Sequence, residues 1–371
     1  MKIDSNTDIN NLKFLNDDTS LTIDNNYLNK LKKIAKGDID IDCFNLIKNE
    51  INENKLRFKI TPQEKNYLKN IPESMALEYI IYRYKFKEFP KKKISTDFPI
   101  YILIEPVSSC NLKCPMCFQS DKSFIKKEYM GKMNFELYKK IIDEASVNGT
   151  KAITFGSRGE PTIHPEFKSF LDYCSNKFLD IKLITNATKL NDDLIHTVFK
   201  NKIHQVVFSI DSEEKNAYER IRKFGNYDQV LNNVKRYNEI KKEYKNINTI
   251  TRISGVKVEE EQDEKKFCDF WKPYADEVVM KPAFSRWDTY NNNVINDFLE
   301  PCSYIWERMY IWFDGKVNPC DADYKSFLSY GNVKDSSIKE IWNSKKYKDL
   351  QKKHLIKERN KITPCDRCGI S

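Results

Sequence analysis

The sequence predicts an α/β fold built on a parallel β-sheet, because short apolar runs alternate with helical patterns between residues 101 and 280. The six runs are YILIE (101–105), KAITF (151–155), DIKLIT (180–185), HQVVFSI (204–210), INTITRISGV (247–256) and DEVVM (276–280). Strands that alternate with helices form βα units, and the strands of such units run parallel in one sheet. Active sites in these sheets lie at the carboxyl ends of the strands, so the residues that follow each run are candidates for the site.

The helical patterns between these runs have the polar start signals of helices. NFELYKKIIDEASVNG begins with a capping residue, Asn134, followed by Glu136 in the first turn. The other helical segments are 165–178, 191–201, 214–222, 227–243 and 260–274.

The two ends of the chain differ from this central pattern. Residues 1–98 are poor in glycine and read as a helical extension, and PKKKISTDFP (90–99) reads as a linker with a proline at each end. After Met280 the alternation stops, and RMYIWFDGKVNPC (308–320) predicts a hairpin that turns at Asp314 and Gly315. We therefore expect three parts: 1–98, 99–285 and 286–371.

Composition excludes several classes of protein. The 371 residues are 40% hydrophobic and 32% charged, with a net charge of +9 that is spread along the chain, so we expect no nucleic-acid partner. The N-terminus lacks the apolar core of a signal peptide, and no stretch approaches the ~20 apolar residues of a membrane span. We expect a cytoplasmic protein without membrane contact, in which clustered cysteines indicate metal rather than disulfides.

Three cysteines crowd the loop after the first predicted strand. Cys110, Cys114 and Cys117 have the spacing C-x3-C-x2-C, and thiolates are ligands for zinc, copper(I) or iron–sulfur clusters. A structural zinc ion takes four ligands, so here it would need His164 or a distant cysteine as the fourth. A cubane cluster held by three cysteines instead leaves one iron open to an exogenous ligand. The spacing favours the cluster and leaves the zinc alternative open.

The stretch CNLKCPMC resembles the signature of the radical S-adenosylmethionine (SAM) enzymes. The resemblance implies a partial (βα)6 TIM-like barrel in which the three cysteines bind a [4Fe–4S] cluster and SAM chelates the fourth iron. It further implies that an electron cleaves SAM to a 5′-deoxyadenosyl radical, which abstracts hydrogen from the substrate. An external one-electron reductant such as flavodoxin or ferredoxin is then required. The radical arises at the cluster, so no side chain is predicted as catalytic.

The resemblance extends to the segment after the second strand, FGSRGEPTIHP. Gly159 and Glu160 match a glycine-rich segment of the family, whereas Arg158 stands where a glycine is common. A backbone without a Cβ can approach the methionine moiety of SAM closely, and Glu160 could bond its ammonium group.

Further contacts with SAM are implied at later strand ends and beside the third cysteine. Asn186 would lie near the cofactor, Ser209 matches a position that contacts ribose or carboxylate, Arg222 is a candidate for the SAM carboxylate, and Val256 would lie against the adenine. Met116 occupies a position that is usually aromatic, where the adenine contact is through the backbone, and Phe118 lies close by in the sequence.

Four more cysteines occur near the C-terminus, at Cys302, Cys320, Cys365 and Cys368. Their spacing alone fits zinc or a fully ligated cluster equally well. Their order resembles a shortened, twitch-type SPASM domain, which implies a small C-terminal domain with one auxiliary [4Fe–4S] cluster. Such a cluster could accept an electron from a substrate radical, or it could be purely structural.

The substrate is the least determined feature. The four-cysteine tail resembles that of dehydrogenases of aminocyclitol or sugar-like alcohols, so we expect oxidation of a small polar molecule. Enzymes with the full SPASM domain more often modify ribosomally made peptides or proteins, which is the alternative. A leader-peptide-binding module at the N-terminus would need several strands, and that region reads as helical. A zinc-binding interaction protein without catalysis is the alternative of a different class.

Overall fold

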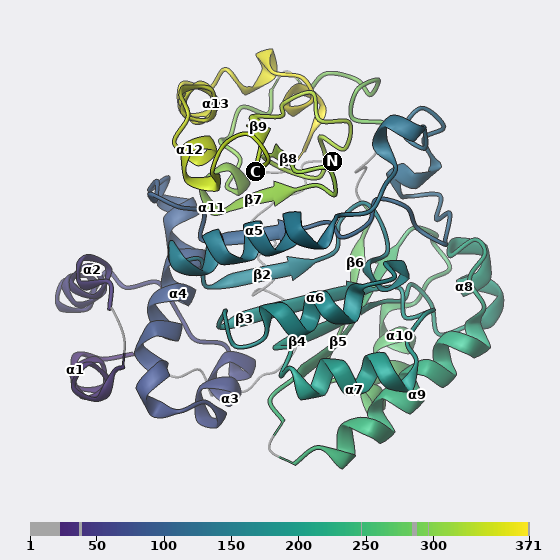
Figure 1. The fold of residues 1–371 in the computed structure, drawn as a ribbon, viewed down its shortest axis with the longest axis horizontal. Helices are drawn as coiled ribbons and strands as arrows, with labels where there is room; N and C mark the ends of the chain where they lie inside the picture. The colour runs from purple at the N-terminus through teal and green to yellow at the C-terminus, as the bar shows by residue number, and fades with distance from the viewer. Residues whose placement is uncertain (1–22, 37–38, 246, 284–287, 296, 370–371) are drawn as a thin grey trace. The chain divides into compact units, whose positions relative to one another are not determined.

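The computed structural model describes residues 23–36, 39–245, 247–283, 288–295 and 297–369 of the chain (Figure 1). The chain divides into two compact units. One comprises Met1–Thr96, Cys302–Glu307 and Gly369–Ser371, and the other comprises Asp97–Pro301 and Arg308–Cys368. These units do not follow the three-part division expected from the sequence, which stays a proposal.

The first unit is helical in its described residues. Side-chain oxygens of Asp24, Asp40 and Thr61 accept hydrogen bonds from the first turns of its three N-terminal helices, which satisfies backbone N–H groups that have no partner inside a helix. No strand occurs among residues 23–36 and 39–96. The helices are α1 (Asn25–Ile34), α2 (Ile41–Asn52), α3 (Pro62–Asn70), α4 (Glu73–Lys92) and α11 (Tyr304–Glu307).

Helix α4 corrects the expected start of the linker. It continues through Pro90 and ends at Lys92, and Lys93 closes it in the left-handed conformation with φ 57°. A proline removes one N–H and so costs most in the middle of a helix. Here the side chains of Phe89 and Pro90 are buried, and this packing offsets the lost bond.

A parallel sheet forms the centre of the second unit. Its strands follow the order β6-β5-β4-β3-β2-β1, and every neighbouring pair among them is parallel, which confirms the predicted α/β fold. The strand order follows the chain order, so right-handed crossovers place the connecting helices on one face, as in a partial barrel. The strands are β1 (Tyr101–Ile104), β2 (Ala152–Phe155), β3 (Asp180–Thr185), β4 (Gln205–Ser209), β5 (Ile250–Lys257) and β6 (Glu277–Pro282).

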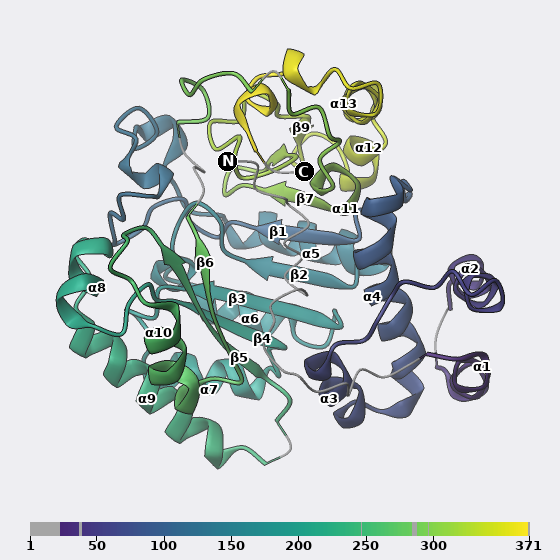
Figure 2. The same cartoon turned by 180° about the vertical axis from the view of Figure 1, so that it is seen from behind.

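Six helices connect these strands and bury their apolar faces against the sheet. Figure 1 shows α5, α6 and α7 in front of the strands, and Figure 2 shows the strands from behind. Tyr138 of α5 stacks on Phe170 of α6 with ring centroids 4.0 Å apart, and both side chains are fully buried. The helices are α5 (Phe135–Val147), α6 (Phe167–Cys174), α7 (Asp192–Lys200), α8 (Lys215–Ile221), α9 (Tyr227–Glu243) and α10 (Glu264–Trp271).

The predicted hairpin is present, and it extends the same sheet. Strand β7 (Arg308–Ile311) pairs parallel with β1, and it pairs antiparallel with β8 (Lys316–Asn318), which pairs with β9 (Gly331–Asn332). The turn requires Gly315, because its φ is +87° and a Cβ there would lie 2.5 Å from the Asn332 Oδ1 atom. Helices α12 (Ile338–Trp342) and α13 (Lys345–Leu355) follow.

None of the described helices has the length and apolar character that crossing a bilayer requires. Several loops contain short 3₁₀ helices. The 3₁₀ helices are η1 (Phe118–Ser120), η2 (Lys127–Tyr129), η3 (Pro161–Ile163), η4 (Lys272–Tyr274), η5 (Arg359–Lys361) and η6 (Cys365–Arg367).

Candidate active site

The three cysteines of the first loop lie together beyond the carboxyl end of β1. Burial, together with the charges of Glu160, Cys117 and Cys114, raises the pKa of the Cys110 thiol to about 12. Mutual repulsion of this kind requires the thiols to be close neighbours. Thiols bind a metal as thiolates and release their protons when they do so, and a close group of three thiols fits such a role.

A zinc ion and a cubane cluster place different demands on the three thiols. A zinc ion needs its ligands to converge on one point at about 2.3 Å for sulfur. Among the residues described, no three His, Cys, Asp or Glu side chains are placed so that they could hold one metal ion. In a cubane each thiolate binds a different iron, so neighbouring thiols need not converge.

Polar side chains at the ends of β2 and β3 surround Cys110. The Asn186 Nδ2 atom lies 3.8 Å from the Cys110 sulfur and 3.1 Å from the Asn111 Oδ1 atom, and the backbone N–H of Leu112 donates to the same sulfur at 3.4 Å. Donors to a ligating sulfur stabilise its thiolate and influence the reduction potential of a cluster. Asn186, which the sequence implicated in the cofactor site, thus lies beside the first cysteine.

Glu160 is a buried carboxylate without a cationic partner among the described residues. Its Oε1 atom accepts hydrogen bonds from the hydroxyls of Thr162 and Thr185, at 2.7 and 2.6 Å, while Oε2 accepts from the backbone N–H of Asn186 at 2.7 Å. Burial raises the pKa of Glu160 and these hydrogen bonds lower it. A buried carboxylate with a free lone pair on Oε2 is suited to a cationic ligand, and the ammonium group of SAM meets that description.

Arg222, at the C-terminal end of α8, and Asp211, just after β4, form a largely buried ion pair. The Arg222 Nε atom lies 2.6 Å from Asp211 Oδ2, and the other carboxylate oxygen of Asp211 accepts from the Val256 N–H at 2.9 Å. Burial raises the pKa of the Cys114 thiol, whereas the charge of Arg222 and its hydrogen bond to that thiol lower it. This pair therefore connects Val256 of β5, the end of α8 and the second cysteine.

Gly159 is required by close packing of two loops. A Cβ at this position would lie 2.0 Å from the Val107 carbonyl oxygen and 2.5 Å from that of Ser109. The glycine thus lets the loop after β2 lie directly against the segment that leads into Cys110. This reason differs from the expected approach to the methionine moiety, because the Cβ direction is occupied by protein.

The remaining predicted residues are placed less specifically. Met116 is half-buried in the cysteine loop, and Ser209 ends β4, paired with Ser254 of β5. Phe118 is buried, and its ring packs against Phe124 and stacks on Tyr324 at 5.3 Å. The contacts of these three side chains with SAM stay predictions.

Several polar residues of the site were not singled out from the sequence. Asp211, Asn111 and Gln119 carry hydrogen bonds that hold the loops together, and Gln119 Nε2 donates to the carbonyls of Ser108 and Arg158, both at 2.6 Å. Asp211 had a usable signal, because it directly follows the predicted strand HQVVFSI. Asn111 and Gln119 lie beside the cysteines but belong to no spacing pattern.

Three of the four C-terminal cysteines form a second group in the larger unit. Burial raises the pKa of Cys320 well above its usual value, and the charges of Cys365, Asp323 and Cys368 raise it further, so these thiols are neighbours. Cys302 is buried beside α11 in the smaller unit, and its place as the fourth ligand stays a prediction.

A hydrogen-bonded clasp joins the segments that follow Cys117 and Cys320. The carboxylate oxygen Oδ2 of Asp121 accepts from the Tyr324 hydroxyl and pairs with Lys325 Nζ, both at 2.8 Å, and Lys325 also donates to the Ser123 hydroxyl at 2.6 Å. We call Asp121, Ser123, Tyr324 and Lys325 the inter-loop clasp. It physically connects the two cysteine groups within one compact unit.

Arg158 binds the backbone of Tyr324, which is one of the clasp residues. Its guanidinium makes two bonds to the Glu105 carboxylate, at 2.5 and 2.6 Å, and donates to the Tyr324 carbonyl at 2.7 Å. The guanidinium also lies 4.1 Å from the ring centroid of Trp312. Arg158 replaces the glycine common at this position of the family, and it binds the SPASM-like region instead of leaving space.

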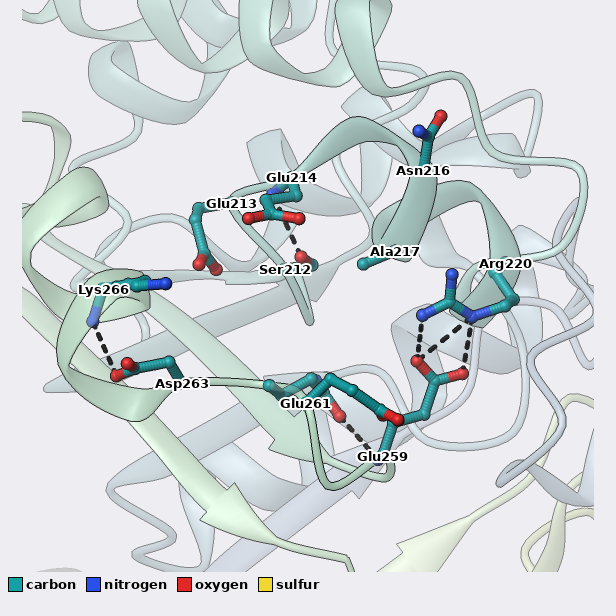
Figure 3. Close-up of a pocket in the computed structure, with 11 residues that line it drawn as sticks. Ser212, Glu213, Glu214, Asn216, Ala217, Arg220, Glu259, Glu261, Asp263 and Lys266 are labelled. Carbon is teal, nitrogen blue, oxygen red and sulfur yellow. Dashed lines mark hydrogen bonds and ion pairs between the residues drawn. The ribbon is translucent and has the colours of Figure 1, made fainter.

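A polar pocket of about 120 Å³ lies nearby, between α8 and the loop after β5 (Figure 3). Figure 3 shows Arg220 paired with Glu259 across one side of it, and Glu213 and Glu214 on the other. It is lined by neither cysteine group nor by Glu160, so it is separate from the candidate site.

Comparison with known protein families decides what this site is. The profile of the Radical SAM superfamily matches residues 104–270. The chain contains a radical SAM domain. A second profile, the SPASM iron-sulfur cluster-binding domain, matches residues 302–369 and includes all four C-terminal cysteines. Together the two regions imply SAM and two [4Fe–4S] clusters.

Individual relatives resemble different parts of this chain. A tungsten-containing aldehyde ferredoxin oxidoreductase cofactor-modifying protein of Pyrococcus furiosus is 33% identical over 112 residues, which are 30% of this chain and 30% of that protein. A cysteine-type anaerobic sulfatase-maturating enzyme of Clostridium novyi is 26% identical over 324 residues, covering 70% of this chain and 84% of that enzyme. The chain thus spans under a third of the first relative and most of the second.

A solved structure shares the fold over most of the chain. Streptococcus suis SuiB bound to S-adenosylmethionine superposes with a TM-score of 0.56 at 17% identity, covering 85% of this chain and 84% of that one. At this identity the likeness concerns the fold alone, and it agrees with the mostly parallel sheet described above.

Proposed function

We propose that this radical SAM enzyme is a maturase that modifies a ribosomally made peptide or protein. The observation that carries the proposal is the alignment with the sulfatase-maturating enzyme, which extends over 324 residues and 84% of that relative. SuiB, which shares the fold, has also been crystallised with its precursor peptide SuiA. The expected oxidation of a small sugar-like substrate depends on the short cysteine tail alone, and the comparisons do not support it.

The residues of the first site would hold SAM by its charged groups. When bound, the cluster and SAM supply a carbon-centred radical that abstracts hydrogen from the substrate. Glu160 would accept from the SAM ammonium group through Oε2, and Asn186 would keep the Cys110 side of the loop in place. Arg222, fixed by Asp211, would offer its remaining donors to the SAM carboxylate. Closure of this site by protein on several strand ends would exclude water from the radical.

The second cysteine group would hold the cluster that accepts an electron from the substrate radical. Cys302, Cys320, Cys365 and Cys368 would hold the auxiliary cluster, and the inter-loop clasp would keep it at a fixed place relative to the SAM site. Removal of one hydrogen atom and one further electron and proton from the substrate is a net two-electron oxidation. A flavodoxin- or ferredoxin-like protein would supply the electron that starts each turnover.

The proposal is tested by co-expression. The chain is produced anaerobically with each short peptide encoded beside its gene, and the peptides are analysed by mass spectrometry. We expect one of them to lose the mass of two hydrogens, and the Cys114→Ala variant to leave it unchanged. The proposal would be wrong if the peptides stay unmodified and only polyhydroxylated small molecules stimulate formation of 5′-deoxyadenosine. That result would favour a sugar-like substrate.

A further inference from the structure

We propose that Arg359 is a positioning and charge-compensating residue for the auxiliary cluster, and that its positive charge raises the reduction potential of that cluster. The proposal deepens the proposed function, because it rests on the auxiliary cluster acting as an electron acceptor. Neither the cysteine spacing nor the relatives assign a role to this arginine.

All three donor nitrogens of Arg359 bind backbone carbonyls of the cysteine segments. Its Nε and Nη2 atoms donate to the carbonyl oxygens of Cys365 and Cys368, at 3.3 and 2.6 Å. Its Nη1 atom donates to the carbonyl oxygen of Glu300, at 3.0 Å, and Glu300 precedes Cys302 by two positions in the sequence. One guanidinium thus fixes the backbone of the final cysteine pair, which a flexible lysine could not do with the same geometry.

The charge of Arg359 has no protein partner among the residues described. Its side chain is 1% exposed, its guanidinium lies 4.6 Å from the ring centroid of Phe298, and it forms no ion pair. The neighbouring carboxylate of Asp366 is already paired with Arg367. Buried charges are costly unless they are paired or lie beside an ion of opposite sign, so the site requires an anion.

A thiolate-bound cluster is the anion that this position offers. Four thiolates around a [4Fe–4S]²⁺ core leave a net negative charge, and reduction by one electron makes that charge more negative. A fixed positive charge therefore stabilises the reduced state more than the oxidised state, which raises the potential. A higher potential suits a cluster that takes an electron from a substrate radical.

The test measures the potential rather than turnover. The full-length chain is prepared with Cys110, Cys114 and Cys117 changed to alanine, so that only the auxiliary cluster contributes to the reduced spectrum. Its midpoint potential is then determined by spectroscopically monitored titration for three variants: Arg359→Met, Arg359→Lys, and the double variant Asp366→Asn/Arg367→Gln. The double variant is the matched control, because it removes an arginine from the same loop without changing the net charge.

We expect a lower midpoint potential for Arg359→Met and values near the parent for Arg359→Lys and for the double variant. Loss of the cluster in Arg359→Met but not in Arg359→Lys would also support a requirement for the charge. An unchanged potential in Arg359→Met, an equal shift in the control, or loss of the cluster in both Arg359 variants would overturn the proposal. Iron analysis of the parent separates this result from failure of the proposed function, since about four irons must be present first.

Discussion

Lys325 Nζ lies 2.8 Å from the Asp121 Oδ2 atom, and this ion pair joins the segment after Cys117 to the segment after Cys320. Both side chains are largely shielded from solvent, at 11% and 14% exposure, so the pair is screened less than a surface pair would be. Burial acts against ionisation of Asp121, yet hydrogen bonds from Lys325, Ser123 and Tyr324 lower its pKa. The clasp is therefore charged and intact at neutral pH, where it can hold the two cluster segments together.

Asp121→Asn should loosen the two segments without unfolding the enzyme. Loss of a charge-assisted hydrogen bond costs about 1.5–3 kcal/mol, and asparagine keeps the size of the side chain. We expect faster amide hydrogen exchange at residues 321–328 of the holoenzyme, near-normal formation of 5′-deoxyadenosine, and less product for each SAM cleaved. Hydrogen-exchange mass spectrometry and product analysis provide these measurements.

Asp143→Asn is the matched control for this variant. Asp143 is also bonded by a tyrosine hydroxyl and a lysine, Tyr173 and Lys177, both at 2.6 Å, but it lies on α5. We expect it to leave exchange at residues 321–328 and the ratio of product to cleaved SAM unchanged. Equal effects of the two substitutions would show that the clasp does not specifically hold the two cysteine segments together.

Glu160→Gln should weaken SAM binding while the protein keeps its cluster. Glu160 is buried and has no cationic partner among the described residues, so the charge of SAM would be its counter-ion. Truncating one partner of a buried charged pair costs about 2–5 kcal/mol, which is roughly 30-fold or more in the dissociation constant. Titration of SAM into the anaerobic protein measures this, with Thr162→Val as the control that removes only a donor to Glu160. A dissociation constant within threefold of wild type would rule out the assigned contact.

Single cysteine substitutions should separate the two clusters. Cys114→Ala should abolish 5′-deoxyadenosine formation, because the first cluster loses a ligand. Cys365→Ala should spare SAM cleavage and block modification of the substrate. Iron analysis should give about eight irons per chain for the wild type and about four for each variant, by the cysteine-ligand count. Loss of SAM cleavage in Cys365→Ala would contradict separate roles for the two groups.

His164 should make stability depend on pH. Its Nε2 atom bonds the Met133 carbonyl at 3.0 Å and its Nδ1 atom accepts from the Glu166 N–H at 3.1 Å, which suits the neutral ring. Burial lowers the pKa of His164 below 6.5, so the unfolded chain takes up a proton more readily than the folded chain. The stabilisation is therefore present above about pH 6.5 and is lost as the pH falls below it.

Thermal unfolding of the anaerobic protein at several pH values checks this prediction. The decrease in Tm between about pH 7.5 and 5.5 should be smaller for His164→Gln than for the wild type. Identical decreases in both proteins would show that another group governs this range.

Much of the fold was predictable, because each βα unit is encoded locally by an apolar run and a capped helix. All six predicted strands are present, and the cysteine loop follows the first one. The pairing of β7 with β1 was not predictable, since it depends on a contact between residues about two hundred positions apart. Helix α4 passed through Pro90 because tertiary burial outweighed a local breaking signal.

The candidate site was predictable to a similar extent. Glu160 and Asn186 follow successive strands, so their positions in the sequence placed them at one edge of the sheet, whereas Arg222 lies at the end of α8. The partners of Arg158 and Asp121 could not be inferred, because Glu105 and Lys325 belong to no motif and lie far away in the sequence. The substrate could not be predicted either, since cysteine spacing indicates which clusters are bound and not which substrate binds beside them.

The central claim is that SAM occupies an open iron of the three-cysteine cluster. Electron–nuclear double resonance on the reduced protein with SAM labelled by ¹⁵N at its amino group tests this most directly. We predict a ¹⁵N coupling to the cluster that is absent when unlabelled SAM is used. Absence of that coupling in reduced protein saturated with labelled SAM would contradict the account, because the open iron would then belong to another ligand.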